Sequence, residues 1–272
     1  MVERFVLDSA RKIPPFSHVV IFYNTFYDKW RILLPFIKRN MEEKNSILYF
    51  SNGPLDDIPS IHGEAGINLA EARRKRGLTV SDGERWYLAK GSPGKTRIFN
   101  IWMESVRDAL SKGFRGLCIL CEPISFFGLD PRMVLRYEKS LPKRFSRPIS
   151  VVCQYSVEDL LSLEDGTVLL RLADAHSHVV TPSFVGSIDL ANYYLQSLMN
   201  SLDDILGETI SSVFFSFLRA KKRYSKGTKS NGVEGLGRHL KEFFGEDAAR
   251  IIKNHVLKEQ YQRIGLRFRS LL

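Results

Sequence analysis

A glycine- and lysine-containing segment in the first third of the chain has residue types that bind phosphate. The run from Ala89 to Thr96, AKGSPGKT, fits a loosened Walker A pattern, with alanine in place of the first glycine. It follows a strand-like run and precedes a helical one, as a phosphate loop does. In such a loop Lys95 would reach the terminal phosphates of ATP and Thr96 would hold Mg²⁺. The candidate nucleotide-binding residues are therefore Gly91, Gly94, Lys95 and Thr96.

Three features of this segment oppose nucleotide binding. The match follows the third strand-like run, whereas a RecA-like phosphate loop follows the first strand. Ala89 carries a Cβ where glycine's freedom is often needed, and Pro93 removes one amide donor from the loop. After the first strand the chain reads NTFYDKW, from Asn24 to Trp30, and without glycine it cannot form an amide nest for phosphate. A degenerate ATPase is therefore the alternative and not the leading hypothesis.

The cysteines and two histidines are the other candidates for chemistry. Cys118 and Cys121 form a CxxC inside a strand pattern, where residues three apart point to opposite faces, so buried structural thiols are the better interpretation. Cys121 and Cys153 both lie near the carboxyl ends of strands; if those strands are adjacent, the pair is a candidate redox or metal-sensing site. His176 and His178 lack an evident third ligand, which favours a surface or capping role over zinc.

No combination of residues in the sequence points to catalysis. We find no Ser/His/Asp arrangement, no paired acidic constellation and no nucleophile elbow. We therefore expect a protein that binds a ligand without turning it over, with no metal and no cofactor. ATP and Mg²⁺ enter only under the nucleotide-binding alternative.

Composition and charge limit the class of protein. The 272 residues are 44% hydrophobic and 26% charged, as in a globular domain with a small appendage. No apolar run reaches eighteen residues, and the N-terminal MVERFVLDSARKIPPF does not resemble a signal peptide. Three cysteines are too few for a disulfide framework, so we expect a cytoplasmic protein. The net charge of +10 leaves open a basic adaptor that binds nucleic acid, for which the candidate residues are Lys221, Lys222, Arg223, Lys226 and Lys229.

Hydrophobic patterning predicts two parts. Up to residue 185, buried-strand runs alternate with amphipathic segments, which indicates βαβ units around a mostly parallel sheet with helices on both faces. Expected strands cover 18–23, 46–50, 78–80, 85–88, 117–121, 148–154 and 179–182, with a turn at Ser81-Asp82-Gly83. From residue 186 to 272 the pattern is all-helical, with helices over 188–224, 236–244 and 246–261. The apolar helix around Phe214 suggests a homodimer.

The order of features resembles a known family. The segments that carry the resemblance are His18 followed by FYN, PFI at 35–37, ILYFSNG at 47–53, Trp86-Tyr87-Leu88 with Gly91, ALSKG at 109–113, the strand 116–122, Tyr137-Glu138-Lys139, VCQYS at 152–156, and His176. Together they resemble the MEDS domain, a RecA-like sensory domain of methanogens and methylotrophs that lacks an intact phosphate loop. The C-terminal helices are similar to small helical output modules of archaeal sensors.

The resemblance implies a sensory protein with a MEDS-like domain over 15–185 and a helical output or dimerisation module over 186–272. Such a domain is expected to bind a small ligand such as a hydrocarbon derivative. It is expected to signal through its output module in transcriptional regulation, with DNA or a transcription protein as a further partner. In open α/β sheets ligands bind at the carboxyl edge of the sheet. We therefore expect the pocket to be lined by Asn24, Thr25, Ser51, Trp86, Glu122, Gln154 and Tyr155.

Overall fold

The computed structural model describes residues 13–51, 77–83, 95–123, 130–162, 167–224 and 232–268. The chain divides into two compact units, Met1–Ile188 and Asp189–Leu272. The first is an α/β unit and the second is helical, which confirms the predicted fold class of a mostly parallel sheet followed by an all-helical module. None of the described helices combines the length and the apolar character that a membrane crossing requires.

Seven strands form the sheet of the first unit, in the order β3-β2-β4-β5-β1-β6-β7. They are β1 (His18–Tyr23), β2 (Ser46–Ser51), β3 (Leu78–Asp82), β4 (Leu117–Cys121), β5 (Ile149–Ser156), β6 (His178–Val180) and β7 (Val185–Gly186). All neighbouring pairs are parallel except β6 with β7. β1 and β4 have the predicted bounds, because both are short runs of buried apolar residues.

The edge strand β3 is longer than predicted. Ser81 and Asp82, expected in a turn, continue the strand and pair with Phe50 and Ser51 of β2. The hydrogen-bonding edge offered by β2 thus outweighs the local turn propensity of Ser-Asp-Gly. The strand predicted over 85–88 lies outside the described residues.

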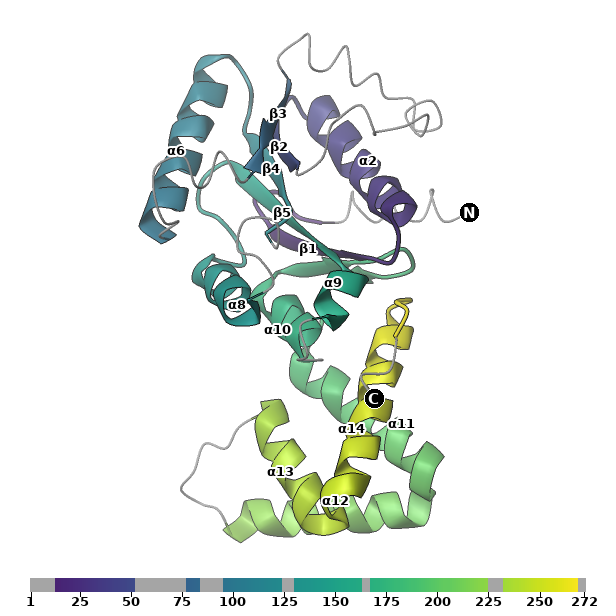
Figure 1. Cartoon of the computed structure of the whole chain (residues 1–272). Coiled ribbons are helices and arrows are strands. Elements are labelled where there is room, and N and C mark those ends of the chain that lie inside the picture. Colours follow the sequence, from purple (N-terminus) through teal and green to yellow (C-terminus); the bar gives the residue numbers. More distant parts are fainter. Residues whose placement is uncertain are drawn as a thin grey trace. The chain divides into compact units, whose positions relative to one another are not determined.

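Helices cover both faces of the sheet, as Figure 1 shows for α2 and α6. They are α2 (Phe26–Glu42), α6 (Lys95–Ser111), α8 (Pro131–Ser140), α9 (Val157–Leu161) and α10 (Val168–Ala175). α8 begins where the sequence predicts: the Asp130 side chain accepts a hydrogen bond from the Arg132 amide, and Pro131 occupies the first helical position.

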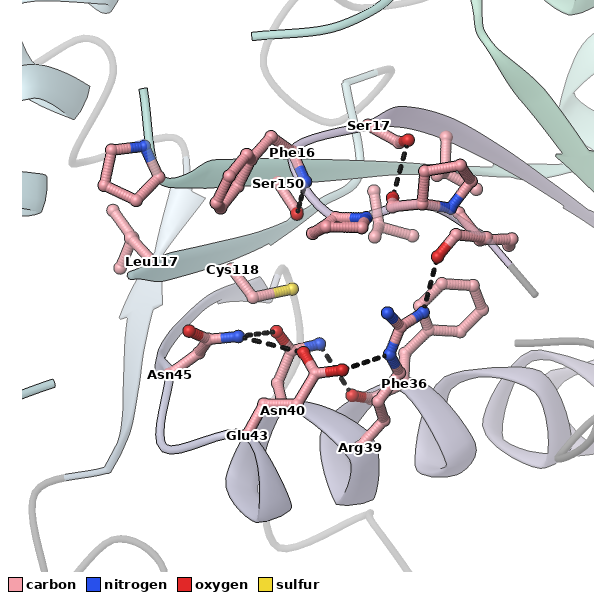
Figure 2. Close-up of a pocket in the computed structure, with 16 residues that line it drawn as sticks. Phe16, Ser17, Phe36, Arg39, Asn40, Glu43, Asn45, Leu117, Cys118 and Ser150 are labelled. Carbon is pink, nitrogen blue, oxygen red and sulfur yellow. Dashed lines mark hydrogen bonds and ion pairs between the residues drawn. The ribbon is translucent and has the colours of Figure 1, made fainter. Parts of the chain in front are cut away.

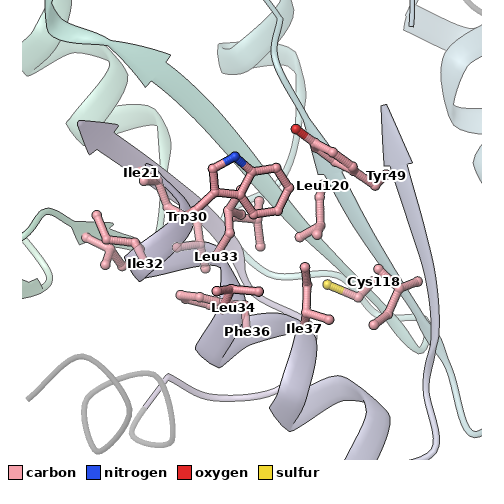
Figure 3. Close-up of a cluster of buried hydrophobic side chains, with 14 of the residues drawn as sticks. Ile21, Trp30, Ile32, Leu33, Leu34, Phe36, Ile37, Tyr49, Cys118 and Leu120 are labelled. Atoms are coloured by element: carbon pink, nitrogen blue, oxygen red, sulfur yellow. The ribbon is translucent and has the colours of Figure 1, made fainter. Parts of the chain in front are cut away.

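The core between α2 and the sheet fixes which strand residues face this helix. Ile21, Tyr49, Leu120 and Val152 of four strands pack in one buried cluster with α2 residues such as Trp30 (Figure 3). Since side chains alternate along a strand, the residues between them face the opposite side. Trp102 of α6 contacts Phe145 on that opposite side, and Phe145 in turn contacts His18.

The second unit contains α11 (Leu190–Leu206), α12 (Glu208–Tyr224), α13 (Gly232–Phe244) and α14 (Glu246–Arg263). The stretch predicted to be helical over 188–224 contains two helices, because Gly207 adopts a left-handed φ of 81° between them. Phe214 is fully buried against Phe243 and Phe244 of α13. The apolar side of α12 at Phe214 therefore belongs to the core of this unit. The homodimer stays a prediction, and the apolar helix around Phe214 no longer supports it.

Candidate functional site

Four side chains with metal-binding or proton-binding atoms meet on the α8 side of the sheet. They are His18, Glu138, Cys153 and His176, which we call the His/Glu/Cys cluster. His18 opens β1, Cys153 lies in β5, Glu138 lies in α8, and His176 caps the C-terminus of α10. Because β1 pairs with both β5 and β6, the fold brings four segments that are distant in sequence to one point.

The cluster is compact and closed to solvent. The Nε2 atoms of His18 and His176 lie 3.1 and 3.4 Å from Oε2 of Glu138, and all three side chains are fully buried. The Cys153 Sγ lies 3.4 Å from His18 Nε2 and 3.6 Å from Glu138 Oε2. The two imidazole rings are tilted by 41° to each other, with centroids 3.8 Å apart.

Two further contacts orient the cluster. The Tyr155 hydroxyl donates a short hydrogen bond to Oε1 of Glu138, which leaves Oε2 for the histidines. Nδ1 of His176 lies 2.6 Å from the Leu172 carbonyl oxygen; since a carbonyl only accepts, this nitrogen carries the proton. The Nε2 lone pair of a neutral His176 therefore faces the cluster.

Burial controls the charges. It lowers the pKa of His18 to about 4, with a further contribution from His176, against the opposing effect of Glu138. Burial also works against ionisation of Glu138, but His176 and His18 outweigh it and hold the pKa of this carboxyl well below its usual range. Burial raises the pKa of the Cys153 thiol and of the Tyr155 hydroxyl well above their ordinary values. Glu138 is thus held as a carboxylate, beside a thiol and a phenol that stay protonated.

Cys121 lies beside the cluster. It is the direct register partner of Cys153 on the adjacent strand, and the two sulfur atoms are 3.6 Å apart. From the sequence, a redox or metal-sensing pair of these cysteines requires adjacent strands, and β4 and β5 are adjacent. All three cysteines are buried and unbridged, and Cys118 packs on the opposite face of the sheet, as the CxxC spacing within a strand predicts.

The sequence placed His176 at a surface or a cap, without a third ligand nearby. The capping role is confirmed by its position, but the side chain is buried and the fold supplies three neighbours from other segments. His178 begins β6 and stays outside the cluster, bonded to Ser177. Glu138 and His18 were noticed only as parts of a family pattern, because neither has a local signal for chemistry.

The carboxyl edge of the sheet holds a second polar group, on the α2 side. Glu122, which follows β4, accepts hydrogen bonds from the Lys29 ammonium at 2.5 Å and from the Tyr49 hydroxyl at 3.0 Å. The Lys29 ammonium also lies 5.8 to 5.9 Å from the ring centroids of Tyr23, Phe26, Trp30 and Tyr49. We call Lys29, Glu122, Tyr49 and Gln154 the edge group.

Gln154 belongs to the edge group by register. Cys121 and Cys153 are register partners on adjacent strands, and their side chains lie on the α8 side of the sheet. The residues that follow them, Glu122 and Gln154, therefore both project to the opposite, α2 side. Gln154 is 1% exposed, and neither its amide oxygen nor its amide nitrogen has a hydrogen-bond partner in the described parts of the chain. Buried amides are nearly always bonded, so this one is available to a ligand or to a segment not described.

The predicted pocket residues are thus divided between two faces. Asn24 follows β1, and Thr25 is the N-cap of α2, where its Oγ1 accepts from the Asp28 amide. Ser51 ends β2. Glu122 and Gln154 face α2, whereas Tyr155 faces α8 and bonds Glu138. Trp86 lies outside the described residues.

The residues of the two alternatives are only partly described. Lys95 and Thr96 are the first two residues of α6, while Gly91 and Gly94 lie outside the described residues. Lys221, Lys222 and Arg223 belong to the last turn of α12, and Lys226 and Lys229 are not described. Nucleotide and nucleic-acid binding therefore stay predictions.

A small pocket lies at the amino edge of the sheet, opposite to the predicted position (Figure 2). Its polar side chains bond mainly to each other: Arg39 to Glu43, and Asn45 to both Asn40 and Glu43. Asn40 also donates to the Phe36 carbonyl. The polar groups of this pocket are already paired, so it is the weaker candidate for a ligand site.

Comparison with known proteins identifies the first unit. Residues 17–177 match the model of the MEDS family, the "MEthanogen/methylotroph, DcmR Sensory domain". The chain belongs to the MEDS family. All four residues of the His/Glu/Cys cluster and the described edge group lie within the matched MEDS segment. No curated protein matches the chain significantly.

Two solved structures show distant similarity. An uncharacterized protein, PH0321 from Pyrococcus horikoshii, in complex with an unknown peptide, is 16% identical, with a TM-score of 0.45 over 65% of this chain and 81% of that one. A unique ATP synthase subunit, NeqB from Nanoarcheaum equitans, is 11% identical, with a TM-score of 0.43 over 96% of this chain and 78% of that one. Both similarities are too low to support a functional argument.

Proposed function

We propose that this protein is a non-catalytic sensor whose MEDS domain binds a small ligand at the edge group and signals through the helical unit, with transcription as the regulated process. Membership in a sensory family supports the general role. The observation that carries the binding site is the buried amide of Gln154 next to Glu122, which has no hydrogen-bond partner among the described residues.

The chemistry of the edge group indicates the kind of ligand. Four aromatic rings surround the Lys29 ammonium, whose charge Glu122 balances. A ligand bound there meets apolar ring surface on one side and an amide donor and acceptor on the other. This arrangement suits a short hydrocarbon chain with one neutral polar group, such as a small alcohol.

The test compares binding of such probes to the full chain and to Gln154→Leu. We expect at least one of the probes methanol, ethanol and 1-propanol to give saturable chemical-shift changes, with affinity at least about tenfold weaker in the variant because a buried hydrogen bond is lost. Gln154→Leu should fold, since it removes a buried polar group that has no partner in the part of the chain that the structure describes.

Gln260→Leu is the matched control. Gln260 is also fully buried with an amide that lacks partners in the described residues, but it lies in α14 of the helical unit. We expect it to bind probes like the wild type. Absence of saturable binding in the wild type, or equal binding by Gln154→Leu, would overturn the proposed site.

The nucleotide-binding alternative keeps one favourable observation: α6 begins at Lys95, where the helix after a phosphate loop would begin. It predicts Mg²⁺-dependent ATP binding by the full chain that Lys95→Ala abolishes, measured by calorimetry. Lack of ATP binding in both proteins would remove this alternative.

A further inference from the structure

We infer that the His/Glu/Cys cluster is a binding site for one divalent transition-metal ion of the zinc class, held by His18, Glu138, Cys153 and His176. The site lies on the α8 face of the sheet, opposite to the edge group, and does not depend on the proposed function. Imidazole, thiolate and carboxylate are the ligands that zinc takes in proteins.

The distances agree with a tetrahedral site. Metal–ligand bonds of about 2.0 to 2.3 Å place neighbouring ligand atoms of a tetrahedron about 3.3 to 3.8 Å apart. Four of the six separations between the ligand atoms are 3.1, 3.4, 3.4 and 3.6 Å, and the other two are no longer than 4.8 Å. The ligand atoms therefore need to move by about an ångström or less to surround an ion.

The lone pairs of His176 Nε2 and Glu138 Oε2 face each other and require a cation between them. With its Nδ1 proton donated to the Leu172 carbonyl, neutral His176 directs the lone pair of Nε2 toward Oε2 of Glu138, 3.4 Å away, and Nε2 makes no hydrogen bond in the described residues. Two acceptors facing each other in a dry interior repel unless a positive charge lies between them. A proton on His176 or a metal ion supplies that charge.

The total charge and the surrounding hydrogen bonds favour a metal ion. A divalent ion with a Glu138 carboxylate and a Cys153 thiolate gives a site with no net charge, which is the least costly arrangement in full burial. Binding would release the Cys153 proton, because only the thiolate is a ligand. The hydrogen bonds of Tyr155 to Glu138 and of His176 to Leu172 orient the ligands as outer partners do in known metal sites.

Burial dictates how the site must be loaded in the test. All four residues are inaccessible in the folded protein, so the full chain is refolded from denaturant with excess Zn²⁺ and then dialysed, and the bound metal is measured by atomic spectroscopy. We expect about one zinc ion per chain in the wild type. Cys153→Ser and His176→Gln should each retain at least about tenfold less.

Co²⁺ identifies the ligand that each variant removes. Wild-type protein refolded with Co²⁺ should show the thiolate-to-cobalt charge-transfer absorption, and Cys153→Ser should lose it. Cys121→Ser and Cys118→Ser are matched controls: both cysteines are buried, but neither belongs to the four ligands. Both should keep the absorption and the zinc content.

Near-native circular dichroism and tryptophan fluorescence confirm that each variant folds. If His176→Gln does not fold, Cys153→Ser alone decides through the charge-transfer band. A wild type that retains no zinc would overturn the inference. So would a cobalt–thiolate band that persists in Cys153→Ser or disappears in Cys121→Ser.

Discussion

Acidification should destabilise the first unit through His18. This imidazole is buried, and its pKa is lowered from 6.5 to about 4 by burial and by His176, against the opposing effect of Glu138. A histidine whose pKa is lower in the folded state binds more protons when unfolded. Neutral His18 therefore contributes fully to the stability of the folded state above the pKa of the unfolded chain. This contribution is lost as the pH falls from about 6.5 toward about 4.

The magnitude follows from the size of the shift. One pKa unit corresponds to about 1.36 kcal/mol, so His18 contributes in full about 3 kcal/mol to the free energy of unfolding. Integration from about pH 7 to about pH 5 gives a loss of about 2 kcal/mol in the free energy of unfolding. Glu138 adds little in this range, since a carboxylate with a lowered pKa loses its contribution only at lower pH, below its usual pKa.

Urea unfolding followed by tryptophan fluorescence measures this loss. Trp30 and Trp102 are buried in the first unit, so the signal reports on the unit that contains His18. A chelator is present throughout to keep the cluster free of metal. The wild type and His18→Asn are compared at pH 7 and pH 5.

The free energy of unfolding should differ less between pH 7 and pH 5 in His18→Asn than in the wild type, by about 2 kcal/mol. His255→Asn serves as the control, because the His255 side chain is 38% exposed and lies in the second unit. Equal pH dependence in His18→Asn and the wild type would refute the assignment of this titration to the cluster.

Three further predictions concern stability, each measured by denaturant unfolding. Lys29→Met should destabilise the protein by about 2 to 4 kcal/mol because it leaves the Glu122 carboxylate without its ammonium partner, and combining it with Glu122→Gln should restore part of the loss; purely additive effects would contradict the coupling. Gly207→Ala should cost about 1 kcal/mol because of its positive φ, whereas Gly237→Ala, inside α13 with open space at its Cβ, should stabilise by about 0.5 to 1 kcal/mol; the same sign for both would be inconsistent with this reasoning. Phe214→Ala should cost about 3 to 5 kcal/mol by opening a cavity in the second unit, and a loss below 1 kcal/mol would show that this core is not formed as described.

Local patterns predicted most of the elements. HVVIFY and LCILC gave the bounds of β1 and β4, and Asp130-Pro131 located the start of α8. These signals are readable because strand burial, capping and glycine conformations act between residues close in sequence. Gly207 was missed because a single glycine in a helical pattern is also tolerated inside a helix.

The sequence by itself determined the α/β class, the helical C-terminal part and the resemblance to MEDS domains. Only the tertiary structure decided which polar residues meet. Strand order is set by long-range pairing: β1 lies between β5 and β6, and this places His18, Cys153 and His176 around Glu138. Each of the four has a local sequence context typical of a core or cap residue. Their chemistry arises from their convergence in a dry interior, where an unpaired lone pair or charge is costly.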